Sequence, residues 1–124
     1  MNNDQRILED NYNIADESFL YYLHEKNQFN IESFWNLYDS IVELRKADSE
    51  EKFNMDLIRK LNFIYKSILQ LFLYHMDSKD EYYIEKFPQE DYNLYIERLD
   101  GAIDGFYGGY EVKEELFELK RLNY

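Results

Sequence analysis

The sequence contains no cysteine, and this absence excludes disulfide bonds, zinc sites built from thiolates and a thiol nucleophile. Only one proline and four glycines occur, and the chain has no internal repeat, low-complexity tract or linker. Its longest uninterrupted apolar run, 71–74, is far too short to cross a membrane, and residues 1–6 lack the basic and apolar pattern of a signal peptide. We therefore expect a soluble, cytoplasmic protein with no membrane partner.

Basic residues are also scarce in this chain. Lys and Arg number 14 against 26 Asp and Glu, which gives a net charge of −12. A surface this negative repels the phosphates of nucleic acids, so direct nucleic-acid binding is disfavoured and a basic protein partner is favoured. At 124 residues the chain is long enough for one domain with its own core, which we expect to span 1–124. The sequence leaves the oligomeric state open.

Aromatic residues are abundant, with 13 Tyr and 9 Phe in a chain that is 19% aromatic. Aromatic side chains bury large areas, so a packed fold is expected in spite of the high charge. A core of this size does not hold all the tyrosines, and some of them must lie at the surface. Tyrosine is favoured at protein interfaces, so surface tyrosines on an acidic protein indicate a protein-binding function.

The spacing of apolar residues predicts an all-α fold, a compact bundle of about five helices. Residues 1–14 carry few apolar positions and are expected to be loosely structured. The first two predicted helices span about 16–26 and 31–47, a long third helix starts at 48 or 54 and ends at 76, and the last two span 89–107 and, as a short helix, 111–122. Asp48, with a capping-box pattern, is an alternative to Asn54 as the start of the third helix.

Several local signals fix where these helices begin and which way they face. Asn30 is a predicted N-cap, and Phe29 before it is placed to meet Phe34 in a hydrophobic staple. Phe34 and Trp35 should therefore lie in the core. Asp16 and Glu17 are expected in the first turn of their helix, at the positive end of its dipole.

The later part of the chain has signals of the same kind. The third helix is apolar nearly all round beyond Ile68, so its second half should be the most enclosed element of the bundle. Pro88 suits the first turn of the following helix, and Gly108 with Gly109 should end that helix. In the last helix, Val112, Leu116, Leu119 and Leu122 are expected to face one side.

Residues suited to catalysis are few. His24 precedes Glu25, but adjacent residues on a helix point about 100° apart, so we do not expect the two side chains to meet. His75 is expected to be a core or rim residue bonded to a carbonyl. Asp100 and Asp104 lie one turn apart, and such pairs on an acidic protein are more often a solvated face than a metal site. No phosphate-binding loop, nucleophile elbow or H-E-x-x-H motif occurs, so we expect no enzyme, no cofactor and no metal.

Negative charge is concentrated in two parts of the chain. Residues 1–25 hold six acids and one base and 77–111 hold ten acids and three bases, whereas 45–66 hold six bases and four acids. On the predicted helix 89–107, five polar residues fall within about 80° of one another: Glu90, Asn93, Glu97, Asp100 and Asp104. Tyr107 and Tyr110 lie at the end of this row.

We expect the partner-binding residues to be Glu90, Glu97, Asp100, Asp104, Tyr107 and Tyr110. In this interpretation the row of carboxylates meets a basic, phosphate-binding surface as a nucleic-acid backbone does. The alternative is that the acidic face only keeps the protein soluble. Binding would then move to the acidic N-terminal region, around Glu9, Asp10, Asp16 and Glu17.

Two groups of residues carry a resemblance to a known family. Ser18-Phe19, Leu23-His24-Glu25, Phe29 and Phe34-Trp35 form the first, and Gly105-Phe106-Tyr107 before Gly108-Gly109 forms the second. Over about 17–110 the sequence resembles helical immunity proteins of bacterial polymorphic-toxin and contact-dependent inhibition systems. The resemblance implies a small protein that binds a cognate toxin domain and blocks its active site or substrate path. Many such toxins are nucleases, including RNases of the EndoU type.

Two other functions remain open at this point. A phage-type nuclease inhibitor or nucleic-acid mimic would use the same acidic surface, and a helical protein-interaction adaptor would act on partners unrelated to nucleases. An immunity protein would have a toxin open reading frame beside its gene, a mimic would have prophage neighbours, and an adaptor would bind a basic protein without nuclease activity. All three act by binding, so none of them requires catalytic residues.

Overall fold

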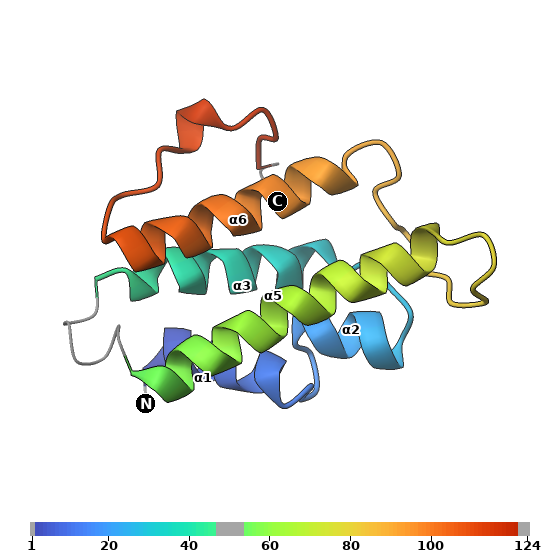
Figure 1. The fold of residues 1–124 in the computed structure, drawn as a ribbon, viewed down its shortest axis with the longest axis horizontal. Helices are drawn as coiled ribbons and strands as arrows, with labels where there is room; N and C mark the ends of the chain where they lie inside the picture. Colours follow the sequence, from blue (N-terminus) through green and yellow to red (C-terminus); the bar gives the residue numbers. More distant parts are fainter. Residues whose placement is uncertain (1, 47–53, 122–124) are drawn as a thin grey trace.

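The computed structural model describes residues 2–46 and 54–121. These residues form five α-helices and no β-strand (Figure 1). The helices are α1 (Asn3–Tyr12), α2 (Phe19–Glu25), α3 (Ile31–Leu44), α5 (Met55–Met76) and α6 (Tyr92–Gly108). The predicted all-α bundle of about five helices is confirmed, although the five are not all the ones that were expected.

Helix α1 corrects the expectation that residues 1–14 are loosely structured. Its N-terminus is a capping box, in which the Gln5 N–H donates to Asn2 Oδ1 (2.8 Å) and the Asn2 N–H donates to Gln5 Oε1 (3.2 Å). The helix buries only Leu8 and Asn11. Caps and two buried side chains therefore suffice for a helix whose low apolar content gave no periodic signal.

Helix α2 begins at Phe19, and its predicted start near residue 16 is wrong. Ser18 is the N-cap, and its hydroxyl oxygen accepts the Tyr21 N–H (3.1 Å). Glu17 has a φ of 70°, a left-handed conformation that cannot continue into a helix. Asp16 and Glu17 thus precede α2 and do not lie in its first turn.

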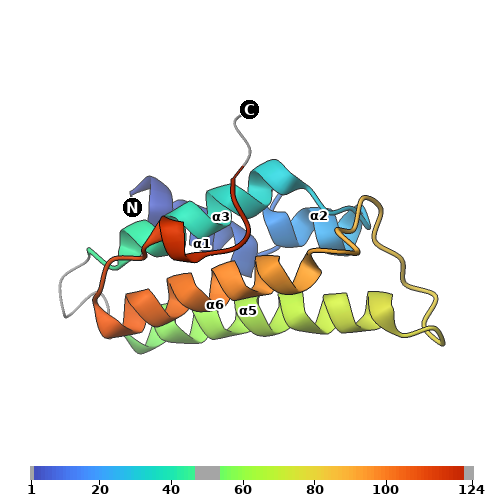
Figure 2. The same cartoon turned by 90° about the horizontal axis from the view of Figure 1, so that it is seen from above.

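Helix α3 contacts three other helices, α1, α2 and α6 (Figures 1 and 2). The predicted N-cap is confirmed, because Asn30 Oδ1 accepts the Ser33 N–H (2.8 Å). The Phe29 and Phe34 rings stack with centroids 6.0 Å apart, and both Phe34 and Trp35 are buried as predicted. The helix ends at Leu44, before the predicted end at residue 47, which lies outside the described residues.

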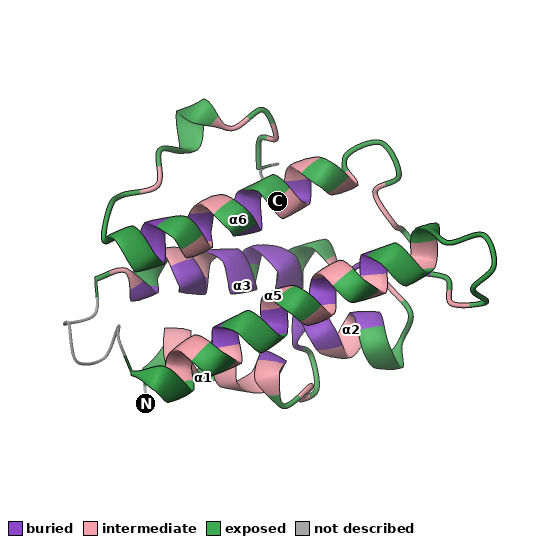
Figure 3. Cartoon of the chain, viewed as in Figure 1, coloured by how far each residue is buried: buried purple, intermediate pink, exposed green. Residues whose placement is uncertain are grey.

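Helix α5 begins after Asn54, whose side chain accepts the Asp56 N–H (2.8 Å). The alternative start at Asp48 lies outside the described residues. The second half of α5 was expected to be the most enclosed element of the bundle, and this prediction is wrong. Leu73 and Tyr74 are exposed, and only one narrow stripe of α5 is buried (Figure 3). That stripe is Leu61, Ile64, Ile68 and Phe72. The helix lies on the outside of the bundle, so its apolar composition did not predict its burial.

An aromatic cluster fills the middle of the core. Phe29 contacts the rings of Phe19, Phe34, Phe72 and Tyr95, with centroids 5.0–6.2 Å apart. These five residues come from α2, α3, α5, α6 and the turn before α3. Aromatic packing therefore ties four helices together, as expected where large rings supply most of the buried area.

Helix α6 starts at Tyr92, three residues after its predicted start. Pro88 lies in the preceding turn, where its carbonyl oxygen accepts the Asp91 N–H (3.0 Å), and not in the first turn of the helix. The end is as predicted, since Gly109 follows the helix with a left-handed φ of 73°. A residue with a side chain is strained in that conformation, which explains the glycine at this position.

The predicted helix 111–122 is wrong. Apart from one 3-10 turn, η1 (Glu114–Leu116), residues 110–121 form an irregular segment that runs along α6 (Figure 1). Leu116 is 76% exposed instead of facing inward, and Leu122 lies outside the described residues. Phe117 points inward instead. Its ring packs so closely on Gly101 of α6 that a Cβ at this glycine would lie 2.6 Å from the ring. We call residues 110–121 the C-terminal strap.

Candidate protein-binding site

Three of the predicted site residues form a row on the exposed face of α6. Glu97, Asp100 and Asp104 all have exposed side chains, and the helical rise places the first and last about 10 Å apart along the axis. We call these three carboxylates the acidic stripe. Asn93 is exposed on the same face, but Glu90 precedes the helix and does not belong to the row.

The tyrosines at the end of the row also lie where predicted, and one of them binds a stripe carboxylate. The Tyr110 hydroxyl donates a hydrogen bond to Asp104. This hydrogen bond is the largest of the effects that raise the pKa of Tyr110, ahead of a little burial and the charges of Asp104 and Asp100. The Asp104 carboxylate is thus held in one orientation by a neighbour, although both groups face solvent.

Glycines allow Tyr110 to reach back to Asp104. The chain reverses direction at Gly109, and the Tyr110 ring then lies against α6. A Cβ at Gly108 would come within 2.7 Å of the Tyr110 ring, and one at Gly105 would lie 3.2 Å from the Tyr110 carbonyl oxygen. Larger residues at either position would push Tyr110 away from the stripe.

Helix α5 supplies two further polar residues to this site. Tyr65 lies beside Asp100, and burial, followed by the charge of Asp100 and the interaction of the hydroxyl with that carboxylate, raises the pKa of Tyr65. About one turn before Tyr65 on α5, Asn62 Oδ1 accepts a hydrogen bond from the Tyr107 hydroxyl (3.2 Å). Sequence reasoning missed Tyr65 as a site residue because its apolar neighbours assigned it to the inner side of α5.

The long-range ion pairs of the described residues lie away from the stripe. Lys60 pairs with Glu9 (2.6 Å), and Arg121 pairs with Asp39 (2.5 Å). Arg98, on the same helix as the stripe, points to the opposite face and pairs with Glu114 (2.6 Å). The one stripe carboxylate with a hydrogen bond in the described residues, Asp104, is held by a tyrosine hydroxyl, which leaves its negative charge in place.

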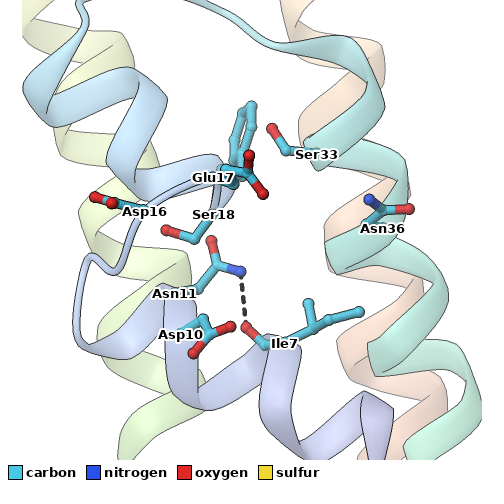
Figure 4. Close-up of a pocket in the computed structure, with 9 residues that line it drawn as sticks. Ile7, Asp10, Asn11, Asp16, Glu17, Ser18, Ser33 and Asn36 are labelled. Carbon is cyan, nitrogen blue, oxygen red and sulfur yellow. Dashed lines mark hydrogen bonds between the residues drawn. The ribbon is translucent and has the colours of Figure 1, made fainter.

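The N-terminal acidic region forms a second candidate site. Asp10, Asp16 and Glu17 lie around a surface pocket of about 190 Å³ between α1, α2 and α3 (Figure 4). Glu9 is not among them, since it pairs with Lys60 of α5. The turn that presents Asp16 and Glu17 contains two left-handed residues, of which Ile14 (φ 54°) is the more strained because it is β-branched.

Buried polar atoms at the base of this pocket already have partners. Asn11 Nδ2 donates to the Ile7 carbonyl oxygen (2.9 Å), and Asn11 Oδ1 accepts the Leu20 N–H (3.1 Å). The Ser33 hydroxyl donates to the Asn30 carbonyl oxygen (3.0 Å). The pocket thus offers carboxylates at its rim but no unsatisfied group that selects a ligand.

Both histidines differ from expectation. His24 and Glu25 do meet, with His24 Nδ1 3.1 Å from Glu25 Oε1, because their flexible exposed side chains bend toward each other near the end of α2. His75 Nδ1 accepts the Ile84 N–H (2.9 Å) instead of bonding to a carbonyl, and its ring packs on Phe87. His75 therefore fastens the segment after α5 to the helix.

Arg98 is the most unusual residue that the sequence reasoning did not identify. Its side chain is 1% exposed. Nε and Nη2 both donate to the Leu119 carbonyl oxygen (3.1 and 2.6 Å), and Nη1 donates to Tyr38 (3.0 Å) and Glu114 (2.6 Å). The guanidinium thereby fastens the C-terminal strap to α6 and α3.

Aromatic rings and a hydrogen-bonded tyrosine complete the surroundings of Arg98. The guanidinium carbon lies 4.5–5.3 Å from the ring centroids of Trp35, Tyr38 and Phe117. Burial, followed by the hydrogen bond that Tyr38 donates to Glu114 (2.6 Å), raises the pKa of Tyr38 to about 12. Helical periodicity alone could not reveal Arg98, because a lone Arg on an apolar face has no local signature.

The described residues, 2–46 and 54–121, hold no group of three or more His, Cys, Asp or Glu side chains placed to bind a metal ion. In the same residues, every helix is too short or too polar to cross a membrane. No protein-family model, curated protein or solved structure matches this chain.

Proposed function

We propose that this protein is an immunity protein that binds and neutralises a cognate bacterial toxin domain. The proposed toxin is a nuclease, such as an EndoU-type RNase, whose basic active site or substrate groove is covered by the acidic stripe. The observation that carries the proposal is the row Glu97, Asp100 and Asp104 on the exposed face of α6, in which the Tyr110 hydroxyl holds the Asp104 carboxylate in place. In this proposal the protein acts by binding in the cytoplasm and catalyses no reaction.

The electrostatics of the chain support this function. A net charge of −12 attracts a basic partner over a distance and accelerates association, most strongly at low salt. Carboxylates that are already oriented lose less side-chain freedom when they meet an Arg or Lys of the partner. Fast capture suits an inhibitor that must reach a nuclease before the nuclease cuts.

Tyr107 and Tyr110 are the proposed anchors at the edge of the contact. Both are partly exposed, and both lie at the C-terminal end of the stripe. A tyrosine ring adds apolar contact area while its hydroxyl keeps a polar partner. Truncation of an anchor of this type costs about 2 kcal/mol or more of binding free energy.

The test uses the toxin domain encoded beside the gene for this protein and measures binding kinetics at two salt concentrations. The stripe variant E97Q/D100N/D104N keeps a hydrogen-bond acceptor at each position and removes three charges. A matched variant, D10N/D16N/E17Q, removes the same charge from the N-terminal pocket. Only the stripe variant should show slower association and a flatter salt dependence, because steering depends on the charges that face the partner.

Other outcomes would contradict the proposal in different ways. If both variants bind as the wild type does, the stripe is a solubility face. If only the pocket variant is slower, the partner binds at the N-terminal region. If the wild-type protein neither binds the toxin domain nor protects cells from it, the immunity function itself is wrong.

A further inference from the structure

We call the line along which α5 and α6 face each other the seam. In one section of the seam, apolar side chains are exposed to solvent. The two helices run antiparallel and side by side (Figures 1 and 2). Polar contacts join them through Asn62 and Tyr107 at one end and through Tyr65 and Asp100 near the middle. At the other end, Gln89 Nε2 donates to Met76 Sδ (3.6 Å) just before α6 begins.

Apolar residues occupy the section between the last two contacts. On α5, Leu69 and Leu73 fall within about 80° of Tyr65 around the helix, so they point to the α6 side. On α6, Ile96 falls within about 40° of Asp100 and faces α5. Leu73 is 67% exposed, and Leu69 and Ile96 are half-buried. We call Leu69, Leu73, Met76 and Ile96 the seam patch.

The seam patch directly adjoins the acidic stripe. Ile96 precedes Glu97, and Asp100 is one turn further along the same helix. Single exposed apolar residues are common, but here two exposed residues, Leu73 and Met76, and two half-buried ones, Leu69 and Ile96, follow one another beside the carboxylates of the stripe. Apolar area beside oriented charge is the composition of a protein-binding surface with a desolvated centre and a polar rim.

We propose that the seam patch is the apolar half of the docking site and receives an apolar side chain from a basic, amphipathic segment of the partner. The proposal rests on the proposed function in taking the partner to be a basic protein. Charge complementarity selects this occupant, because basic residues beside the apolar side chain would meet Glu97 and Asp100. A second copy of this chain would bring its own −12 charge against the stripe and be repelled.

The test uses two synthetic peptides as probes, with binding measured by fluorescence anisotropy. One is a helical peptide with leucines along one face and lysines along the other. Its twin has the same lysines, and alanine replaces every leucine. The leucine peptide should bind the wild-type protein on the order of tenfold more tightly than its twin, since each buried leucine adds transfer free energy.

Three variants locate that preference on the protein. Leu73→Gln should remove most of the difference between the two peptides, because Leu73 is the most exposed residue of the patch. Met55→Gln is the matched control, since Met55 is 75% exposed at the opposite end of α5, and it should leave the difference unchanged. The variant E97Q/D100N/D104N should weaken both peptides by the same factor. A melting curve for each variant confirms that it folds.

Equal affinity of the two peptides for the wild type, or an unchanged preference in Leu73→Gln, would overturn the seam patch as a docking surface. Failure of the proposed function has a different signature. The toxin domain would then fail to bind while the leucine peptide still distinguishes Leu73→Gln from Met55→Gln. The two proposals can therefore fail separately.

Discussion

The two faces of α6 differ in how their charged side chains are surrounded, since the charge on one face is buried and paired and the charges on the other are exposed to solvent. On the inner face, Arg98 is enclosed, and Tyr38, Glu114 and the Leu119 carbonyl oxygen accept its hydrogen bonds. On the outer face, the acidic stripe stands in solvent with its charge uncompensated by a cation of the described residues. A charge that is buried and paired is tied to the fold, whereas an exposed row of like charges contributes little to stability and remains available to a partner.

The largest difference between the faces should appear when Arg98 is removed. Arg98→Ala leaves the Leu119 carbonyl without its donors, opens a cavity between three aromatic rings and frees the C-terminal strap. We expect a loss of about 3–5 kcal/mol in the free energy of unfolding, a large share of the stability of a small domain. Urea denaturation measures it, with Lys66→Ala on the exposed surface of α5 as the control. A loss no larger than that of the control would show that the inner face does not depend on this charge.

Acid should weaken the inner face through Glu114. Burial acts to raise the pKa of this carboxyl, but hydrogen bonds from Tyr38 and Arg98 and the nearby Arg charges outweigh it and lower the pKa below 4.5. The ionised form is favoured in the folded state, so its contribution is present above about pH 4.5 and is lost as the pH falls through the lowered pKa.

Urea denaturation at several pH values should therefore show a decline in stability below about pH 4.5 that becomes smaller in Glu114→Gln. The variant keeps an acceptor for Tyr38 but has no charge to titrate. A control, Glu118→Gln, changes an exposed carboxylate of the same strap. Identical acid slopes for the wild type and both variants would mean that Glu114 is not coupled to folding.

A smaller effect on the outer face should be visible in the titration of Tyr110. Asp104→Asn removes the carboxylate whose hydrogen bond is the main cause of the raised pKa of Tyr110, so that pKa should fall. The pKa of Tyr107 is raised by burial, and the same substitution should leave it unchanged. NMR of ring-labelled tyrosine measures both groups in one sample. A shift of both tyrosines would point to a change in the helix end and not to loss of one hydrogen bond.

The smallest expected effect is on the stability of the stripe variant. E97Q/D100N/D104N should change the free energy of unfolding by less than about 0.5 kcal/mol, because the substitutions lie on an exposed face and relieve mutual repulsion. The same denaturation experiment as for Arg98→Ala measures it. A loss of several kcal/mol would mean that the outer face also holds the fold together, and the contrast between the two faces would disappear.

Local signals in the sequence predicted the parts of the fold that depend on neighbouring residues. Asn30 and Gly109 mark helix ends as expected, and Asn54 is one of the two starts that the sequence offered for its helix, because a cap requires only a side chain and the backbone within three residues of it. The burial of Phe34 and Trp35 followed from the hydrophobic staple at the start of α3. Each of these features is determined by residues within one turn of chain.

Features that depend on distant contacts could not be predicted in the same way. The exposure of Leu73 depends on where α6 and the other helices lie, although the apolar composition of the second half of α5 had suggested that this part of the helix is enclosed. The strap is held by contacts between distant residues, since Arg98 binds Glu114 and the Phe117 ring packs on Gly101, in each case 16 positions away. The acidic stripe was predicted from helical periodicity, because its residues lie on one helix. Tyr65 and Asn62 were not predicted as site residues, because they belong to α5.

The hydrogen bonds between Arg98 and Leu119 have an evolutionary consequence. Arg98 binds the main-chain carbonyl oxygen at this position, and every amino acid supplies that atom. The bonds from Arg98 therefore place no requirement on the side chain of residue 119, which is restricted only by its packing against the core. Insertions or deletions between residues 114 and 119 would instead shift the register and separate Glu114 from the carbonyl that Arg98 binds beside it. Selection should therefore preserve the number of residues between Glu114 and the carbonyl of residue 119.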